Sequence, residues 1–328
     1  MLWTICSVSN GFTRIEPLNN PAANALSLDI AQAVLSEISP GSRLVAIRLA
    51  TGSYSNFTHI VTALDPINAE FSIVVRRYQA FGNYDRGQKA HREFAALEYA
   101  CQNGIPAPHP LYLDDTGDLL GTPGIVTRYV PGKQIQSPVD PLPWARGLAE
   151  TLARIHTVPV DIAPRGLLLD ANNEATWFLH SGQIPDFMQA HPDGEHLWQH
   201  VHRGFPRLEP VPSTLVHVDY WPGNILWDGG RISAVVDWEE AALGDPAIDV
   251  AYCRMDILLR GFHKAADEFL HAYENAVGHR LKNLCFWELA AAARPMFSPQ
   301  GWVDQSPAKE RFAQFITGTM QKLPEYLI

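Results

Sequence analysis

The sequence predicts an α+β protein with two lobes, a small antiparallel-sheet lobe that carries one key helix and a larger, mainly helical lobe. Strand-like segments gather in the first 130 residues, where one helical segment interrupts them, and helical patterns dominate beyond Gly132. A hairpin with polar residues at both ends interrupts the helical half. At 328 residues the chain is long enough for a sizeable core in each lobe.

The predicted organisation has three parts. An irregular arm covers residues 1–25, the small lobe covers 26–130, and the large lobe covers 131–328. Asn19-Asn20-Pro21 breaks regular structure in the arm. Pro131-Gly132 follows the last strand of the small lobe, and no low-complexity linker separates the lobes.

The small lobe begins with a helix that Ser27 caps and that runs to Ile38, because Ile30, Val34 and Ile38 recur on one face. Strands are predicted at 43–50, 57–64 and 70–77, a helix at 85–102, and two further strands at 109–114 and 124–130. One helix after the third of five strands differs from the strand–helix alternation of a Rossmann unit.

The large lobe begins with a helix whose first turn contains Pro143 and whose core face is Leu148, Leu152 and Ile155. Further helices are predicted at 250–259, 264–277, 284–293 and 308–323, with a weaker helical pattern at 195–202.

The hairpin of the large lobe follows an apolar run at residues 214–216. Its strands, 225–227 and 232–236, flank the turn Asp228-Gly229-Gly230, and an Asp-Gly turn between apolar runs is a strong hairpin signal. Asp219 and Asn224 precede the first strand, and Asp237 ends the second. Because an antiparallel return brings these ends together, we expect the three side chains to converge. Their oxygens suit Mg²⁺, a hard cation that protein carboxylates hold together with substrate phosphates.

These residues also carry a family resemblance. The H-x-D-x-x-x-x-N spacing and the later Asp match the catalytic and metal loops of protein kinases. The strings HVDYWPGNILW and VVDWEEAALGDPAID resemble the aminoglycoside phosphotransferase family and its choline kinase-like relatives. The resemblance covers nearly all of residues 43–249. It implies a bilobal protein kinase-like fold and a kinase that uses ATP or GTP, with Mg²⁺, to phosphorylate a hydroxyl of a small molecule. A protein kinase is disfavoured, because neither a DFG motif nor an Ala-Pro-Glu segment follows the hairpin.

The resemblance also implies residue roles around the hairpin. Asp219 is the expected catalytic base, although an Asp that only caps a turn is the alternative. Asn224 and Asp237 are the expected metal ligands, and His217 is expected to brace the loop. The family usually has Gly between the His and the Asp, and this chain has Val218, which puts the local backbone conformation in question.

A second set of roles falls on the small lobe. A kinase carries Lys on its third strand, but the first lysine of this chain is Lys89, so the resemblance assigns phosphate binding to Arg76 and places Val74 over the nucleotide base. An Arg on the surface of an edge strand is the alternative. Glu93 is the expected helix partner of Arg76, against the alternative of a solvated helix face.

The remaining nucleotide contacts are expected from main-chain groups. Gly52 and Ser53, in a loop with one glycine between two strands, are expected to cover the phosphates. The segment from residue 126 to Val130, which includes Arg128, resembles the hinge whose main chain binds the nucleotide base.

Several polar residues are left with open interpretations. Asp245 and Asp249 are expected to brace helices. Glu239 and Glu240 either face a cationic acceptor or form a solvated pair. His196 and His200 lie one helical turn apart, as zinc ligands can, but exposed histidines on a helix are the favoured interpretation.

Composition limits the partners. A net charge of −10 argues against nucleic-acid binding, and it fits either a cationic substrate or simple solubility. No apolar run is long enough to span a membrane, and four dispersed cysteines without a CxxC pair favour the reducing cytoplasm. The oligomeric state is not predicted.

The acceptor is the least defined feature of the sequence. Related folds phosphorylate aminoglycosides, macrolides, choline-like alcohols, homoserine or sugars, and the specificity segment is expected within residues 161–212 and the last helices. Five aromatic residues either line an acceptor pocket or pack in the core: Trp177, Phe178, Trp198, Trp287 and Trp302. A nucleotide-binding regulator without catalysis is the alternative of a different class.

Overall fold

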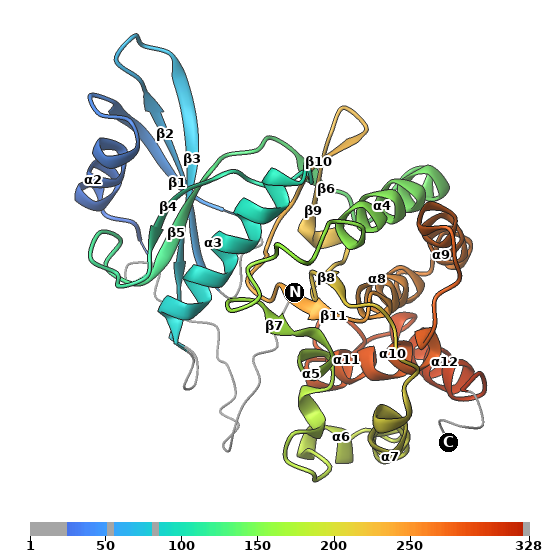
Figure 1. Cartoon of the computed structure of the whole chain (residues 1–328). Helices are drawn as coiled ribbons and strands as arrows, with labels where there is room; N and C mark the ends of the chain where they lie inside the picture. The colour runs from blue at the N-terminus through green and yellow to red at the C-terminus, as the bar shows by residue number, and fades with distance from the viewer. Residues whose placement is uncertain (1–24, 51–55, 81–84, 324–328) are drawn as a thin grey trace. The chain divides into compact units, whose positions relative to one another are not determined.

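The computed structural model describes residues 25–50, 56–80 and 85–323 (Figure 1). The chain divides into two compact units, Met1–Pro131 and Gly132–Ile328. No helix in the described residues is long and apolar enough to cross a bilayer.

The N-terminal unit contains one antiparallel sheet of five strands. The strands lie in the order β1 (Arg43–Leu49), β2 (Asn56–Leu64), β3 (Glu70–Tyr78), β5 (Gly124–Arg128) and β4 (Pro110–Asp114). All five predicted strands are confirmed, with ends that move by two residues or fewer. Because β3 is the middle strand, its residues are paired on both sides.

Two helices accompany this sheet. Helix α2 (Leu28–Ile38) begins at Ser27, whose hydroxyl accepts from the Ile30 amide at 3.2 Å, as the sequence predicts. Its apolar face packs in a cluster with Ile73 and Val75 of β3. Helix α3 (Arg86–Gln102) begins after the cap Asp85 and runs along the other face of the sheet (Figure 1).

The C-terminal unit is mainly helical (Figure 1). Its α-helices are α4 (Pro141–His156), α5 (Ala171–Ala175), α6 (Asp186–Gln189), α7 (Gly194–Gly204), α8 (Ala247–Leu259), α9 (His263–Val277), α10 (Leu284–Ala291), α11 (Ala293–Phe297) and α12 (Ala308–Met320). Single 3-10 turns are η1 (Trp177–Leu179), η2 (Phe205–Arg207) and η3 (Pro222–Asn224). The predicted core face of α4 is confirmed, since Leu148, Leu152 and Ile155 are fully buried.

Two small sheets complete this unit. One has the order β10 (Arg231–Val235), β9 (Ile225–Asp228), β6 (Lys133–Gln134), and the other the order β7 (Leu169–Asp170), β11 (Ala242–Gly244), β8 (Thr214–Val216). The predicted hairpin is β9–β10, in which Arg231 pairs with Asp228. Gly229 and Gly230 form its two-residue turn with φ of 55° and 78°, the left-handed pair that a type I′ turn requires.

One predicted helix is interrupted in the structure. Instead of a single helix over 284–293, the chain forms α10 and α11 on either side of Ala292. Pro295 explains the break, because it has no amide to donate to the carbonyl four residues earlier. Pro295 lies two residues beyond the predicted end of the helix, and the carbonyl that loses its donor lies inside the predicted helix.

Candidate active site

The loop between β8 and β9 contains a residue in the left-handed region. Val218 has φ 69°, which costs an L-residue about 1–2 kcal/mol. The backbone amides of His217 and Val218 both donate to the carboxylate of Asp249, each at 2.7 Å. Asp249 is fully buried on α8, and His156 Nε2 lies 3.1 Å from its Oδ2. The backbone at Val218, which the sequence put in question, is therefore left-handed, and Asp249 braces it.

His217 also braces this loop, as the sequence predicts. Its Nε2 lies 3.0 Å from the carbonyl oxygen of Val236, at the end of β10. Burial lowers the pKa of the His217 imidazole, so the ring is neutral and donates its one proton to that carbonyl. The contact ties the loop to the strand that leads into Asp237.

Asp219 and Asn224 contact each other directly. The Nδ2 group of Asn224 donates to Oδ2 of Asp219 at 2.8 Å and to its backbone oxygen at 2.9 Å. Both side chains are buried, with exposed fractions of 6%. Burial raises the pKa of Asp219 to about 7, while Arg294 lowers it and Asp237 raises it. The influence of Asp237 follows from the hairpin, since the Val236 amide donates to the Asn224 carbonyl at 2.9 Å.

Asn224 and Asp237 are chemically suited to Mg²⁺. An amide oxygen and a carboxylate are hard ligands, and Mg²⁺ is usually held by one or two carboxylates together with phosphates and water rather than by a closed protein cage. Within the described ranges, no group of three or more His, Cys, Asp or Glu side chains is arranged to hold a metal ion. Asn224 and Asp237 supply one amide oxygen and one carboxylate of this kind.

Arg294, on α11, is a site residue that sequence reasoning missed. Its Nη1 donates to Oδ1 of Asp219 at 3.0 Å, and its Nη2 donates to the carbonyl of Val218 at 3.1 Å. The same Nη2 lies 3.5 Å from Glu240, and the guanidinium stacks over Tyr252, 4.4 Å from the ring centre. Burial lowers the pKa of this guanidinium, but Tyr252, Glu240 and Asp219 raise it by more. The one sequence clue was a lone cation in the apolar stretch LAAAARPMF.

The predicted alternative of a solvated Glu239–Glu240 pair is wrong. The exposed fractions of the two residues are 1% and 6%. Burial raises the pKa of Glu240 well above its ordinary value, although Arg294 opposes this. Neither carboxylate oxygen of Glu240 meets a hydrogen-bond partner in the described part of the chain. Glu240 and Asp219 are therefore two buried carboxylates beside one guanidinium.

Arg76 and Glu93 form a buried ion pair in the N-terminal unit. Arg76 Nε lies 3.1 Å from Glu93 Oε2, and the Tyr78 hydroxyl donates to the same oxygen. Arg76 lies on the middle strand and Glu93 is 2% exposed, so the alternatives of an edge-strand Arg and a solvated helix face are both wrong. Val74 lies on the same face of β3 as Arg76 and is half-buried.

The other predicted nucleotide contacts are placed unevenly. Gly52 and Ser53 lie outside the described residues. The amide of Arg128, the last residue of β5, donates to the carbonyl of His109 at 2.8 Å. This amide is therefore already hydrogen-bonded within the protein. Val130 follows the end of β5 and is half-buried.

The histidines of the 180–202 segment do not gather around a metal. His200 Nδ1 lies 2.7 Å from the backbone oxygen of His196, and the ring of His202 stacks on Trp198. His196 is exposed on α7, whereas His200 is half-buried.

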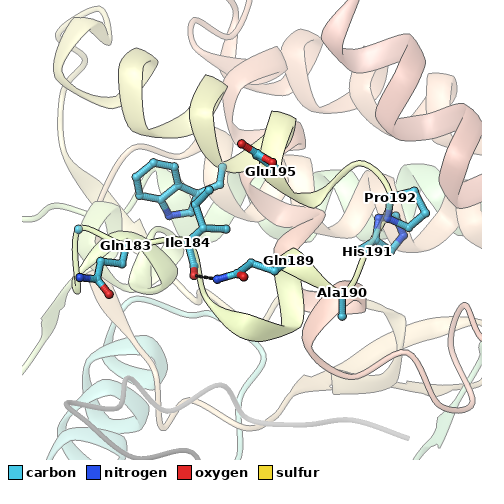
Figure 2. A pocket seen from close by; sticks show the side chains of 9 residues that line it. Gln183, Ile184, Gln189, Ala190, His191, Pro192 and Glu195 are labelled. Atoms are coloured by element: carbon cyan, nitrogen blue, oxygen red, sulfur yellow. Dashed lines mark hydrogen bonds between the residues drawn. The ribbon is translucent and has the colours of Figure 1, made fainter.

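A hollow of about 900 Å³ lies beside α6 and α7 (Figure 2). Gln189 lines it and donates to the Ile184 carbonyl at 2.8 Å (Figure 2). Its lining comes from residues 182–198 and includes Trp198, one of the five predicted aromatics, together with His191 and Glu195. None of the residues predicted to bind nucleotide or metal, or to act as the base, lines it. The other predicted aromatics pack in the core or are half-buried: Trp177, Phe178, Trp287 and Trp302.

Comparison with known proteins shows which family the sequence matches. Residues 48–284 match the model of the phosphotransferase enzyme family. The chain is 27% identical over 205 residues to acyl-CoA dehydrogenase family member 10 of Mus musculus, covering 56% of this chain and 18% of that protein. It is 25% identical over 167 residues to a homoserine kinase of Brucella anthropi, covering 48% and 49%. The matched part of the chain thus spans less than half of the length of these two relatives.

A solved structure has the same fold. A thermostable mutant of aminoglycoside phosphotransferase APH(4)-Ia, in a ternary complex with ADP and hygromycin B, superposes with a TM-score of 0.59. The sequences are 17% identical, and the match covers 88% of this chain and 98% of that one. The predicted kinase-like α+β fold is confirmed.

Proposed function

Because the chain belongs to the phosphotransferase enzyme family, we propose that it transfers the γ-phosphate of ATP or GTP to a hydroxyl of a small molecule. One observation carries this function. Asp219 is buried with one carboxylate oxygen on Asn224 and the other on Arg294, in a loop that Asp249 braces. A carboxylate that only caps a turn has no need of such partners.

Asp219 acts on the acceptor hydroxyl. It orients the hydroxyl for in-line attack and receives its proton as the new oxygen–phosphorus bond forms and the bond to the nucleoside diphosphate breaks. A loop held by Asp249 and His217 keeps this carboxylate in place. Such transfers depend on positioning and on electrostatic stabilisation more than on covalent chemistry.

The phosphates need positive charge. Asn224 and Asp237 would hold Mg²⁺, which neutralises the charge that develops on the phosphate oxygens. Arg76 would bind phosphate oxygens through its fork of N–H donors, with Glu93 fixing its orientation. Val74, the main chain near Val130 and the loop with Gly52 and Ser53 are the proposed nucleotide contacts.

The replacement Asp219→Asn tests this function. It keeps the shape of the side chain but removes the base, so we expect nucleotide turnover to be lost while nucleotide binding stays within about twofold. Asp228→Asn is the matched control, because Asp228 is an exposed residue at the end of β9 in the same hairpin and its replacement should leave turnover unchanged. Undiminished turnover in Asp219→Asn would exclude this mechanism.

The acceptor class is open to a direct screen. An aminoglycoside-like antibiotic is the first candidate, with choline-like alcohols, homoserine and sugars as the other kinase substrates. Nucleotide consumption with each acceptor, with the phosphorylated product identified by mass spectrometry, would select among them.

A regulator that binds nucleotide without catalysis is the second candidate. It predicts a nucleotide-dependent rise in the melting temperature but no Mg²⁺-dependent consumption with any acceptor. The filled positions 219, 224 and 237 support the enzyme instead. The dispersed cysteines support a cytoplasmic protein, and the three that lie in the described residues are free thiols.

A further inference from the structure

The guanidinium of Arg294 connects groups that the proposed mechanism needs in fixed positions. One nitrogen donates to the Asp219 carboxylate and the other to the carbonyl of Val218, the residue with the left-handed backbone. Both bonds come from one planar fork, so they fix the side chain and its backbone together. An ammonium group, which is a point charge, would not impose this geometry.

The Asp219 carboxylate is held at both ends. Oδ1 accepts from Arg294 at 3.0 Å, and Oδ2 accepts from Asn224 at 2.8 Å. A rotation of the carboxylate would break both bonds. Each carboxylate oxygen has two lone pairs, so an acceptor hydroxyl can still be bound.

Buried arginines in this unit are not all aimed at the loop. Arg254, on α8, is 12% exposed and pairs with Glu288 and Asp267. That arrangement joins helices and touches none of the proposed site residues. Arg294 instead donates to the Asp219 carboxylate and the Val218 carbonyl of the loop, and its guanidinium stacks on Tyr252 of α8.

The position of Arg294 depends on the break between α10 and α11. It lies in the first turn of α11, next to Pro295, and ten residues beyond the segment that matches the family. We propose that Arg294 is a positioning residue of the transfer reaction, which holds the Asp219 carboxylate in the orientation that receives the acceptor proton. This inference rests on the proposed function of Asp219.

The first test is Arg294→Ala in the full-length protein with its best acceptor. We expect kcat to fall about 100-fold, as a small misplacement of a reacting group does, while KM for the nucleotide changes about twofold or less. Guanidinium chloride at millimolar concentration should restore part of kcat, because the free ion can occupy the vacated space. A folded variant with normal kcat, or one whose lost turnover does not respond to guanidinium, overturns the inference.

Arg254→Ala is the matched control. It removes an equally buried arginine with two carboxylate partners, so it should lower the melting temperature without a guanidinium-dependent change in kcat. A similar guanidinium response in both variants overturns the inference, since the effect would then belong to any buried arginine.

Arg294→Lys decides the case if Arg294→Ala does not fold. The lysine keeps the charge but has no rigid fork, so it does not fix the Val218 carbonyl and the Asp219 carboxylate relative to each other as the guanidinium does. We expect a fall in kcat of about tenfold, and wild-type kcat overturns the inference. A wild-type protein that consumes no nucleotide with any acceptor overturns the proposed function itself, which is a distinct result.

Discussion

Val218 has a backbone conformation that opposes its side-chain chemistry. A β-branched residue at φ 69° is strained, yet its side chain is only 1% exposed. The hydrogen bonds from the amides of residues 217 and 218 to Asp249 offset this strain. The loop therefore keeps the glycine-like conformation and gains a buried apolar side chain.

This conflict predicts an unusual order of stabilities at position 218. Glycine ordinarily costs about 0.5–1 kcal/mol more than alanine, because it loses more backbone entropy on folding. At a positive φ the order should reverse, with Val218→Gly more stable than Val218→Ala by about 1 kcal/mol. Urea unfolding of the two variants measures the difference.

Val216 is the matched control for that prediction. It is fully buried in β8, two residues earlier, in an extended strand. There the ordinary order should hold, with Val216→Gly less stable than Val216→Ala. The same order at both positions would contradict a strained Val218.

Asp219 also predicts a pH dependence of stability. Burial raises the pKa of its carboxyl to about 7, so the folded, metal-free protein binds this proton more tightly than the unfolded chain does. The contribution of Asp219 is therefore greatest below about pH 4 and is lost as the pH rises through about 7. The free energy of unfolding of the wild type relative to Asp219→Asn should fall across this range, measured by urea unfolding in EDTA. Parallel profiles for the two proteins would contradict the raised pKa.

At the scale of elements, strand β3 separates two arginines onto opposite faces of its sheet. Arg76 pairs with Glu93 of α3, whereas Arg77 donates to the carbonyl of Ala25 at 3.1 Å. Strand alternation predicts this division, and it places Arg76, the proposed phosphate-binding cation, on the face of the sheet that α3 covers.

This alternation provides a matched pair of variants. Arg76→Met should weaken nucleotide binding about tenfold or more, since a charged hydrogen bond contributes about 1.5–3 kcal/mol. Arg77→Met should cost about 1–2 kcal/mol of stability and leave nucleotide affinity unchanged. Calorimetric titration with nucleotide and Mg²⁺ measures the nucleotide affinity of both variants. Equal losses of affinity would contradict the assignment of Arg76.

The elements themselves were largely predictable where the pattern was local. The β9–β10 hairpin follows from an Asp-Gly-Gly turn between apolar runs, and α2 follows from the cap Ser27 and its periodic face. The break at Ala292 was not predicted, because it requires weighing one proline against a strongly helical alanine run. The role of Arg294 was not predicted either, because its partners are 75 and 76 residues away and no local sequence pattern encodes them.

At the scale of the whole molecule, the residues proposed to bind phosphate oxygens and those proposed to bind the metal or act on the acceptor belong to different compact units. Arg76 and Glu93 belong to Met1–Pro131, and Asp219, Asn224 and Asp237 belong to Gly132–Ile328. The family resemblance predicted this split, since its motifs fall in both halves of the chain. Acceptor specificity was not predictable, because residues 161–212, where we expect it to lie, form short helices and turns whose aromatic contacts join distant segments, as Trp177 and Phe297 do.

The split predicts separable effects. Residues without shared partners usually act independently, so nucleotide affinity in the double variant Arg76→Met/Asp219→Asn should equal that of Arg76→Met alone. Turnover in the double variant should equal that of Asp219→Asn. Nucleotide titration and single-turnover kinetics test the two statements, and an affinity loss caused by Asp219→Asn would contradict them.

The parts of the site also differ in when the chain can assemble them. Asp219 and Asn224 are five residues apart, whereas Arg294 is 75 residues from Asp219. Contacts of short sequence separation restrict the chain less and form sooner. On a ribosome Asp219 and Asn224 emerge before Arg294 has been synthesised. Until then we expect Asp219 to stay hydrated, because a carboxylate in water needs no counter-ion. Its burial should follow only when the helix that contains Arg294 has formed.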